Sequence, residues 1–312
     1  MAGNSAGPWS KGIWIAIAAL TLLLVFASGA AASTGGAPSP AGSPPPPGSP
    51  SGSPASGPSA GTLRLIDAQT TPRKSFYFGY RYPRLSFEIA STQAQNDLRI
   101  DVVDVAGESV RTFFRNDVAP NAAVRIRWDG TGNTGRPAPN GRYSFQVSSQ
   151  AGTPTARLAT SSQTTDLSFS FFGYAFPVLG GHDFGSSGAR FGAPRSGHTH
   201  QGQDIMANCG QTEVAARGGK VQYSGYEANA GNYVVIDGKG TGLDFMYAHL
   251  AQPSSLKTGD SVRTGQPIGV VGETGDATAC HLHFEIWTAP GWYQGGSPID
   301  PLPYLQKWDR YS

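Results

Sequence analysis

The stretch Ala279-Cys280-His281-Leu282-His283-Phe284-Glu285 alternates between the two faces that a β-strand would have. Successive side chains of a strand point to opposite faces, so His281 and His283 share one face and the intervening Leu282 packs on the other. Two imidazoles on a rigid strand suit a metal site or an acid–base site. Packed or surface histidines fit the pair equally well, so the rest of the chain decides.

The chain has 312 residues, among them 42 Gly and 24 Pro, and a net charge of +2. This length allows one or two domains with proper cores, together with tails. The charge is nearly balanced and blocks of basic residues are absent, which excludes nucleic acid as the expected partner.

The first 32 residues have the composition of a secretory signal. Lys11 precedes an apolar run over residues 13–27, and small residues follow through Ala32. The run is shorter than the roughly 20 residues of a usual membrane span, but an uncleaved signal anchor through residues 13–27 fits the same pattern. Either alternative places the rest of the chain outside the cytoplasm.

Residues 33–61 consist almost wholly of Gly, Pro, Ser, Ala and Thr. A segment of this composition buries too little apolar surface to offset its ordering entropy, so it is expected to be a flexible tether.

Residues 62–170 have the pattern of an all-β domain. Leu98–Val105 and Val124–Trp128 alternate with the period of half-buried strands, and Asn140-Gly141 marks a turn before Arg142–Val147. This pattern predicts a β-sandwich. Trp128-Asp129-Gly130, with the turn and tyrosine that follow, resembles the immunoglobulin-like module of flagellar hook-capping proteins. That resemblance implies a spacer or a module that binds a wall or protein partner.

Residues 171–305 form a second, Gly-rich β-domain in this interpretation, and residues 306–312 form a tail. The expected strands are Val214–Tyr226, Tyr233–Ile236, Leu243–Leu250 and His281–Trp287. We therefore expect an all-β protein, with an immunoglobulin-like β-sandwich followed by an antiparallel β-domain.

All six histidines lie beyond Gly181, and five fall in three short motifs. In the first, His200 and Asp204 flank a glycine that lets the chain turn so that both side chains face one ion. In the second, strand alternation places Tyr247 and His249 on one face. A catalytic zinc uses three protein ligands and leaves a position for water, so these motifs supply ligands together with spare histidines for proton transfer.

The motifs His200-Gln201-Gly202-Gln203-Asp204, Tyr247-Ala248-His249-Leu250 and His281-Leu282-His283-Phe284-Glu285 resemble, in this order, those of the LytM/lysostaphin-type zinc metallopeptidases. The resemblance spans about residues 176–305. It implies Zn²⁺ held by the three residues His200, Asp204 and His283, with His249 and His281 as catalytic groups. Members of that family hydrolyse peptide bonds in the cross-links of peptidoglycan, usually with a zinc-activated water.

Two residues depart from the family pattern. Gln203 stands where an apolar residue is usual, and Cys280 stands where proline is common; neither change removes a ligand. Cys209 and Cys280 are the only cysteines, and in an exported chain a disulfide between them is expected, with zinc ligation as the alternative. His198 is expected to be solvated and His182 to lie in a loop.

The resulting prediction is an exported zinc metalloendopeptidase, secreted or membrane-anchored and associated with the cell wall, that acts on peptidoglycan. Two alternatives stay open at this point. One is a non-catalytic protein that binds the wall and activates other wall hydrolases, and the other is a zinc peptidase of extracellular proteins.

Overall fold

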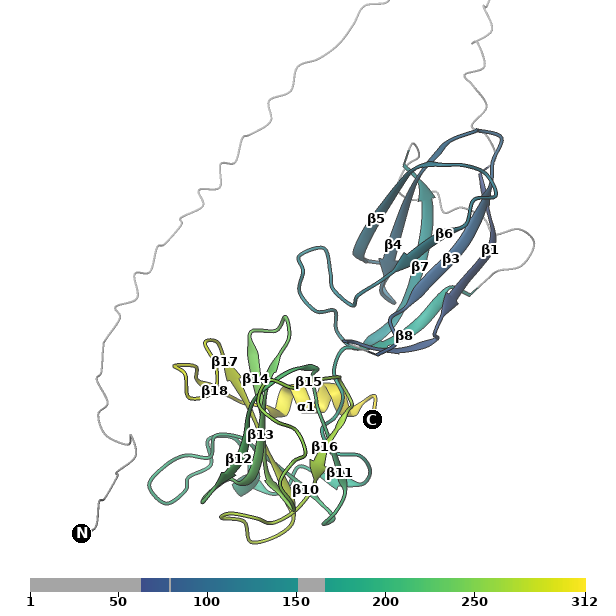
Figure 1. The fold of residues 1–312 in the computed structure, drawn as a ribbon. Helices are drawn as coiled ribbons and strands as arrows, with labels where there is room; N and C mark the ends of the chain where they lie inside the picture. The colour runs from purple at the N-terminus through teal and green to yellow at the C-terminus, as the bar shows by residue number, and fades with distance from the viewer. Residues whose placement is uncertain (1–62, 79, 151–165) are drawn as a thin grey trace, which may run out of the picture. The chain divides into compact units, whose positions relative to one another are not determined.

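The computed structural model describes residues 63–78, 80–150 and 166–312 (Figure 1). The predicted signal or anchor and the predicted tether lie outside the described residues. Within the described ranges, no helix combines the length and the apolar character needed to cross a bilayer.

The described residues form β-strands, with one short 3₁₀-helix and one short α-helix. The strands are β1 Arg64–Thr71, β2 Lys74–Phe76, β3 Arg84–Ala90, β4 Asn96–Val103, β5 Ser109–Val118, β6 Val124–Arg127, β7 Gly141–Ser149, β8 Ser168–Phe172, β9 His182–Asp183, β10 Gln203–Ala207, β11 Thr212–Val214, β12 Gly219–Glu227, β13 Gly231–Gly238, β14 Leu243–Leu250, β15 Ser261–Val262, β16 Pro267–Val270, β17 His281–Thr288 and β18 Pro298–Ile299. The helices are η1 Ser187–Ala189 and α1 Leu302–Asp309. The all-β fold class predicted from the sequence is confirmed.

The first folded part contains two sheets. One has the strand order β1-β3-β6 and the other β2-β8-β7-β4-β5. Buried side chains recur at every second position of β3 and β6, and of β1 on either side of an irregularity between Ile66 and Gln69, as expected for strands with one face in a core. Buried side chains from both sheets belong to a single apolar cluster, so the sheets form a β-sandwich.

Two aromatic residues of the predicted turn-and-core motif pack in the sandwich and bond to its backbone. Trp128 is fully buried, and its indole N–H donates to the carbonyl of Thr131. The Tyr143 hydroxyl donates to the carbonyl of Pro139 at 2.7 Å, a bond from a strand tyrosine to backbone a few residues upstream, as in immunoglobulin-like sandwiches. Both residues thus have the structural roles that their motif indicates.

The second folded part is built on one antiparallel sheet in the order β15-β12-β13-β14-β17-β10-β9, with β18 beside β17. β11 and β16 form a separate two-stranded sheet. The core lies on one face of the large sheet and includes Leu282, Phe284 and Ile286 from alternate positions of β17. The other face of β17 therefore carries His281 and His283, as the alternation predicts.

The single strand expected over residues 214–226 is instead two strands, β11 and β12, in different sheets. The chain changes sheet between Val214 and Gly219. A side chain at Gly218 would lie 2.9 Å from the backbone nitrogen of Thr264, and one at Gly219 would overlap the carbonyl of Asp237. The two glycines thus permit a close crossing of backbones, which strand periodicity does not reveal.

The C-terminal end differs from the predicted tail. Helix α1 continues past residue 305, and its Leu305 and Trp308 are buried in the core. His182 also differs from the loop residue that we expected, because it lies in β9. Its ring stacks on Phe176 at 4.0 Å, and its Nε2 lies 3.2 Å from a carboxylate oxygen of Asp309.

Candidate metal centre

The candidate centre lies where strands β10 and β17 run side by side. In their antiparallel register, Asp204 faces His283 directly, and the next residue pair on the core side is Ile205 with Leu282. Burial of that apolar pair holds the two strands together and turns the carboxylate and the imidazole toward the opposite face.

His200 lies just before β10 and reaches the same point. Its Nδ1 is 2.8 Å from the carbonyl oxygen of Arg190, which accepts a hydrogen bond from the protonated Nδ1 and leaves Nε2 facing inward. That Nε2 lies 3.0 Å from Oδ1 of Asp204 and 2.9 Å from Nδ1 of His283. Gly202 allows this approach, because a Cβ there would lie 2.5 Å from the Phe284 carbonyl and 2.9 Å from the His283 ring.

The three side chains present ligand atoms to one another. In His283 the outer nitrogen, Nε2, is 3.0 Å from a carboxylate oxygen of Glu285, which leaves Nδ1 facing inward. With both outer nitrogens protonated, neutral imidazoles and Asp204 direct lone pairs at one point. All three ligand atoms lie within 4.8 Å of one another. Such a group fits a cation, and an N,N,O set from histidines and a carboxylate suits zinc.

The pKa shifts of Asp204 and His283 also indicate that a positive charge is favoured at this position. Burial alone would raise the pKa of Asp204, but hydrogen bonds to His200 and His283 hold it well below its ordinary range. Burial alone would lower the pKa of His283, but its hydrogen bonds to Asp204 and Glu285 raise it to about 9. The surroundings of Asp204 and His283 therefore favour a positive charge where the ligand atoms meet.

His249 reaches this face through an irregularity in β14, and the prediction that it shares a face with Tyr247 is wrong. Tyr247 is fully buried in the core, where its hydroxyl accepts the backbone N–H of Ala216. Two residues of β14, Ala248 and His249, face one residue of β13, and His249 has φ +64°. This bulge reverses the alternation and turns the imidazole toward the histidine pair.

His249 and His281 stand together beside the three ligand atoms. Their ring centroids are 4.7 Å apart, and Nε2 of His281 lies 3.6 Å from Oδ1 of Asp204. Nδ1 of His249 is 2.8 Å from the Thr274 carbonyl, and Nδ1 of His281 is 2.8 Å from the Ala279 carbonyl. Protons on both Nδ1 atoms leave Nε2 free to exchange a proton. Burial, followed by the neighbouring histidines, lowers the pKa of His249 to about 4, so it is neutral at pH 7.

Two parts of the chain match known protein families. Residues 198–301 match peptidase family M23, and residues 83–153 match the FlgD Ig-like domain. This chain contains a peptidase M23 domain.

Two curated relatives illustrate the match. The peptidoglycan DD-endopeptidase ShyC of Vibrio cholerae is 43% identical over 87 residues, which are 28% of this chain and 20% of ShyC. The glycyl-glycine endopeptidase ALE-1 of Staphylococcus capitis is 34% identical over 113 residues, 36% of this chain and 30% of ALE-1. The chain thus spans less than a third of the length of either relative.

Among solved structures, the catalytic domain of lysostaphin from Staphylococcus simulans is 29% identical. The alignment covers 40% of this chain and 92% of the lysostaphin domain, with a TM-score of 0.35.

Three further side chains contact the residues of the candidate centre and were not predicted to do so. The Arg195 guanidinium is 3.2 Å from the second carboxylate oxygen of Asp204. Gln203 is fully buried and donates to the carbonyls of Phe184 and Asp204. Glu285 accepts from His283. Strand alternation placed Glu285 on the face of His283, which was the one available signal in the sequence.

The remaining predicted residues lie outside the group of ligand atoms. His198 is exposed, as expected, and its Nδ1 is near the carbonyl of Ser196. Cys209 and Cys280 form the predicted disulfide, so neither is a zinc ligand. The bond joins the segment after β10 to the residue before His281, and it therefore links the two strands that position the centre.

Proposed function

We propose that this protein is a zinc metalloendopeptidase that hydrolyses peptide bonds in the cross-links of peptidoglycan. The observation that carries the proposal is the convergence of His200 Nε2, Asp204 Oδ1 and His283 Nδ1 beside two further histidines with free Nε2 atoms. Zinc held by the three converging residues supplies a Lewis acid that polarises a carbonyl and makes a water nucleophilic near neutral pH.

The two further histidines complete the reaction. In hydrolysis, the water oxygen bonds to the carbonyl carbon, one water proton passes to an imidazole, and the C–N bond breaks as the amine gains a proton. His249 is suited to accept the first proton, because its Nδ1 donates to the Thr274 carbonyl and the neutral ring therefore has an unprotonated Nε2. His281, when it carries a proton on Nε2 as well, then stabilises negative charge on the carbonyl oxygen or delivers that proton to the amine, and the proton taken up by His249 returns to His281 or to solvent.

The substrate class rests on the relatives, whose names describe endopeptidases of peptidoglycan or of glycyl-glycine bonds. Action outside the cytoplasm agrees with the Cys209–Cys280 disulfide, which persists in oxidising compartments. The proposal includes export by residues 1–32, either with cleavage or as an anchor through residues 13–27, and association with the cell wall.

The test is digestion of purified peptidoglycan by the full chain loaded with zinc, with product masses measured with and without a chelator. We expect cleaved cross-links that disappear with chelator and with His200→Ala but persist in His198→Ala, a control at an exposed histidine two residues away. Absence of any chelator-sensitive product would favour the non-catalytic, activating alternative. Cleavage of unrelated extracellular proteins but not of peptidoglycan would favour the other alternative.

A further inference from the structure

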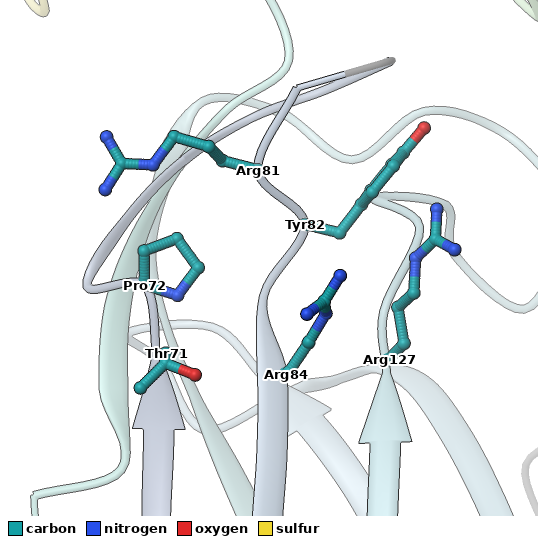
Figure 2. A pocket seen from close by; sticks show the side chains of 6 residues that line it. All are labelled: Thr71, Pro72, Arg81, Tyr82, Arg84 and Arg127. Carbon is teal, nitrogen blue, oxygen red and sulfur yellow. The ribbon is translucent and has the colours of Figure 1, made fainter.

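An open pocket of about 580 Å³ lies on the β-sandwich, where β1 ends, β3 begins and β6 ends (Figure 2). Its lining comprises Thr71, Pro72, Arg81, Tyr82, Arg84 and Arg127. In Figure 2, Arg84 and Arg127 rise side by side from neighbouring strands toward Tyr82, and Arg81 borders the pocket on the other side. Three of the six lining residues are therefore cationic and none is acidic.

The two central arginines are placed against each other by the sheet itself. Arg84 and Arg127 are direct partners in the antiparallel register of β3 and β6. Like charges directly opposite each other are destabilising in a sheet. An anion between the two guanidinium groups would turn this repulsion into attraction, because each group could then donate to it.

The arginines of this pocket differ from others in the sandwich. Arg73, Arg99 and Arg142 each have an aspartate within ion-pair distance. In the described part of the chain, no ion pair involves Arg81, Arg84 or Arg127. All three are exposed, so a ligand from solution can reach them.

Contacts within the protein hold the backbone and one side of the pocket in place. The guanidinium of Arg127 lies over the ring of Tyr82, 4.0 Å from its centroid. The next residue, Trp128, is fully buried, and its backbone N–H donates to the Pro83 carbonyl at 3.0 Å. This bond ties the end of β6 to the chain just before Arg84, so the backbone that carries Arg84 and Arg127 is held in place.

We infer that this pocket binds free carboxylates of peptidoglycan peptides and thereby holds the chain on the polymer that its M23 domain cleaves. The inference rests on the proposed function for the choice of polymer. A guanidinium fork matches the two oxygens of a carboxylate, and the ring of Tyr82 with Pro72 offers apolar surface to the adjoining peptide. The sandwich would then be a substrate-binding module rather than a spacer.

The test is co-sedimentation of the full chain with purified peptidoglycan, stripped of phosphate polymers and kept from cleavage by chelator. We expect Arg84→Gln/Arg127→Gln to weaken binding by about tenfold or more, since charge-assisted contacts are the strong ones. The control variant is Arg64→Gln/Arg115→Gln, which removes the same charge from the far end of β1 and from β5. This variant should bind peptidoglycan as the wild type does. Free-acid wall peptides should compete, whereas the same peptides with amidated carboxylates should not.

Two results would overturn the inference. One is wild-type binding by the Arg84→Gln/Arg127→Gln variant with an unchanged melting temperature. The other is binding that needs the phosphate polymers, which would make phosphate the anion that the pocket recognises.

A second measurement separates the inference from the proposed function. Cleavage of a soluble cross-linked peptide by the zinc-loaded variant should equal that of the wild type. If the variant loses wall binding but still cleaves the peptide, both the binding pocket and the peptidase function are supported. If binding depends on the arginines but the wild type cleaves nothing, the binding pocket is supported and the peptidase function is contradicted.

Discussion

Glu285 holds His283 from the side opposite the candidate metal position, with 3.0 Å between the carboxylate oxygen and Nε2. The other carboxylate oxygen accepts the indole N–H of Trp287 at 2.6 Å and that of Trp292 at 3.3 Å. The orientation and tautomer of the imidazole thus depend on a buried carboxylate that is itself fixed by two indoles.

Replacing Glu285 should therefore weaken zinc binding without removing a ligand. We expect Glu285→Ala to lower zinc affinity by roughly 10- to 100-fold, the usual effect of losing a partner of a metal-bound histidine. Competition titration against a chromophoric chelator measures this affinity. Glu285→Gln keeps an oxygen that can accept from Nε2 and should lose less, and the exposed Glu273→Gln is the control. Equal zinc affinity in all four proteins would contradict this role.

His249 and His281 should be needed for turnover but not for zinc. We expect His249→Ala and His281→Ala each to lower the cleavage rate by about 10²- to 10⁴-fold, the range of positioned acid–base groups. Zinc content should stay at the wild-type level, because neither residue is one of the three converging ligands. Metal analysis and rate measurement on the same sample separate these effects. Near-normal cleavage by His281→Ala with zinc bound would refute its assignment.

Glu213 makes stability depend on pH. It is completely buried, and neither carboxylate oxygen has a hydrogen-bond partner in the described structure. Burial raises its pKa well above the ordinary value. The folded state therefore keeps a proton that the unfolded state releases, and the associated stability is present at acid pH and is lost as pH rises toward the folded-state pKa.

The variant that tests this pH dependence is Glu213→Gln, which replaces the titrating carboxyl group by a neutral amide of similar size. Between the unfolded and folded pKa values, the wild type should lose up to about 1.4 kcal/mol of unfolding free energy per pH unit relative to this variant. Urea unfolding at a series of pH values measures the difference. Parallel stability curves for the two proteins would show that Glu213 does not titrate in this way.

The disulfide should contribute to stability through the unfolded chain. It joins residues 71 apart in sequence, for which the loop-entropy argument gives about 4 kcal/mol. Cys209→Ser/Cys280→Ser should therefore lower the unfolding free energy by an amount of this order, and reduction of the wild type should reproduce the effect. If reduction leaves the unfolding midpoint of the M23 domain unchanged, the bond does not stabilise it.

Much of the architecture was predictable because it follows from local periodicity. The alternation in β17 gave the common face of His281 and His283, and similar patterns located β4, β6, β7 and β14. The convergence of His200, Asp204 and His283 was expected through the resemblance to a family, since residues 83 apart in sequence carry no local sign of contact.

The missed features depend on contacts between distant segments or on backbone conformation. The contact of Arg195 with Asp204 and the buried hydrogen bonds of Gln203 follow from the packing of the segment before β10. The left-handed conformation of His249 is uncommon for a residue with a Cβ and leaves no mark in a period-two pattern. Alternation therefore assigned the correct strand but the wrong face.

The extra residue in β14 means that strand length, as well as side-chain identity, decides where the imidazole of His249 lies. Deleting Ala248 would restore regular pairing with β13 and leave the imidazole of His249 on the face of the histidine pair, but it would move the imidazole along β14 to the place opposite His283 that Ala248 now occupies. A homologue could thus keep every histidine and a more regular sheet, yet hold this imidazole at another place relative to the candidate metal position. Comparisons of such domains should align the lengths of β13 and β14 as well as their histidines.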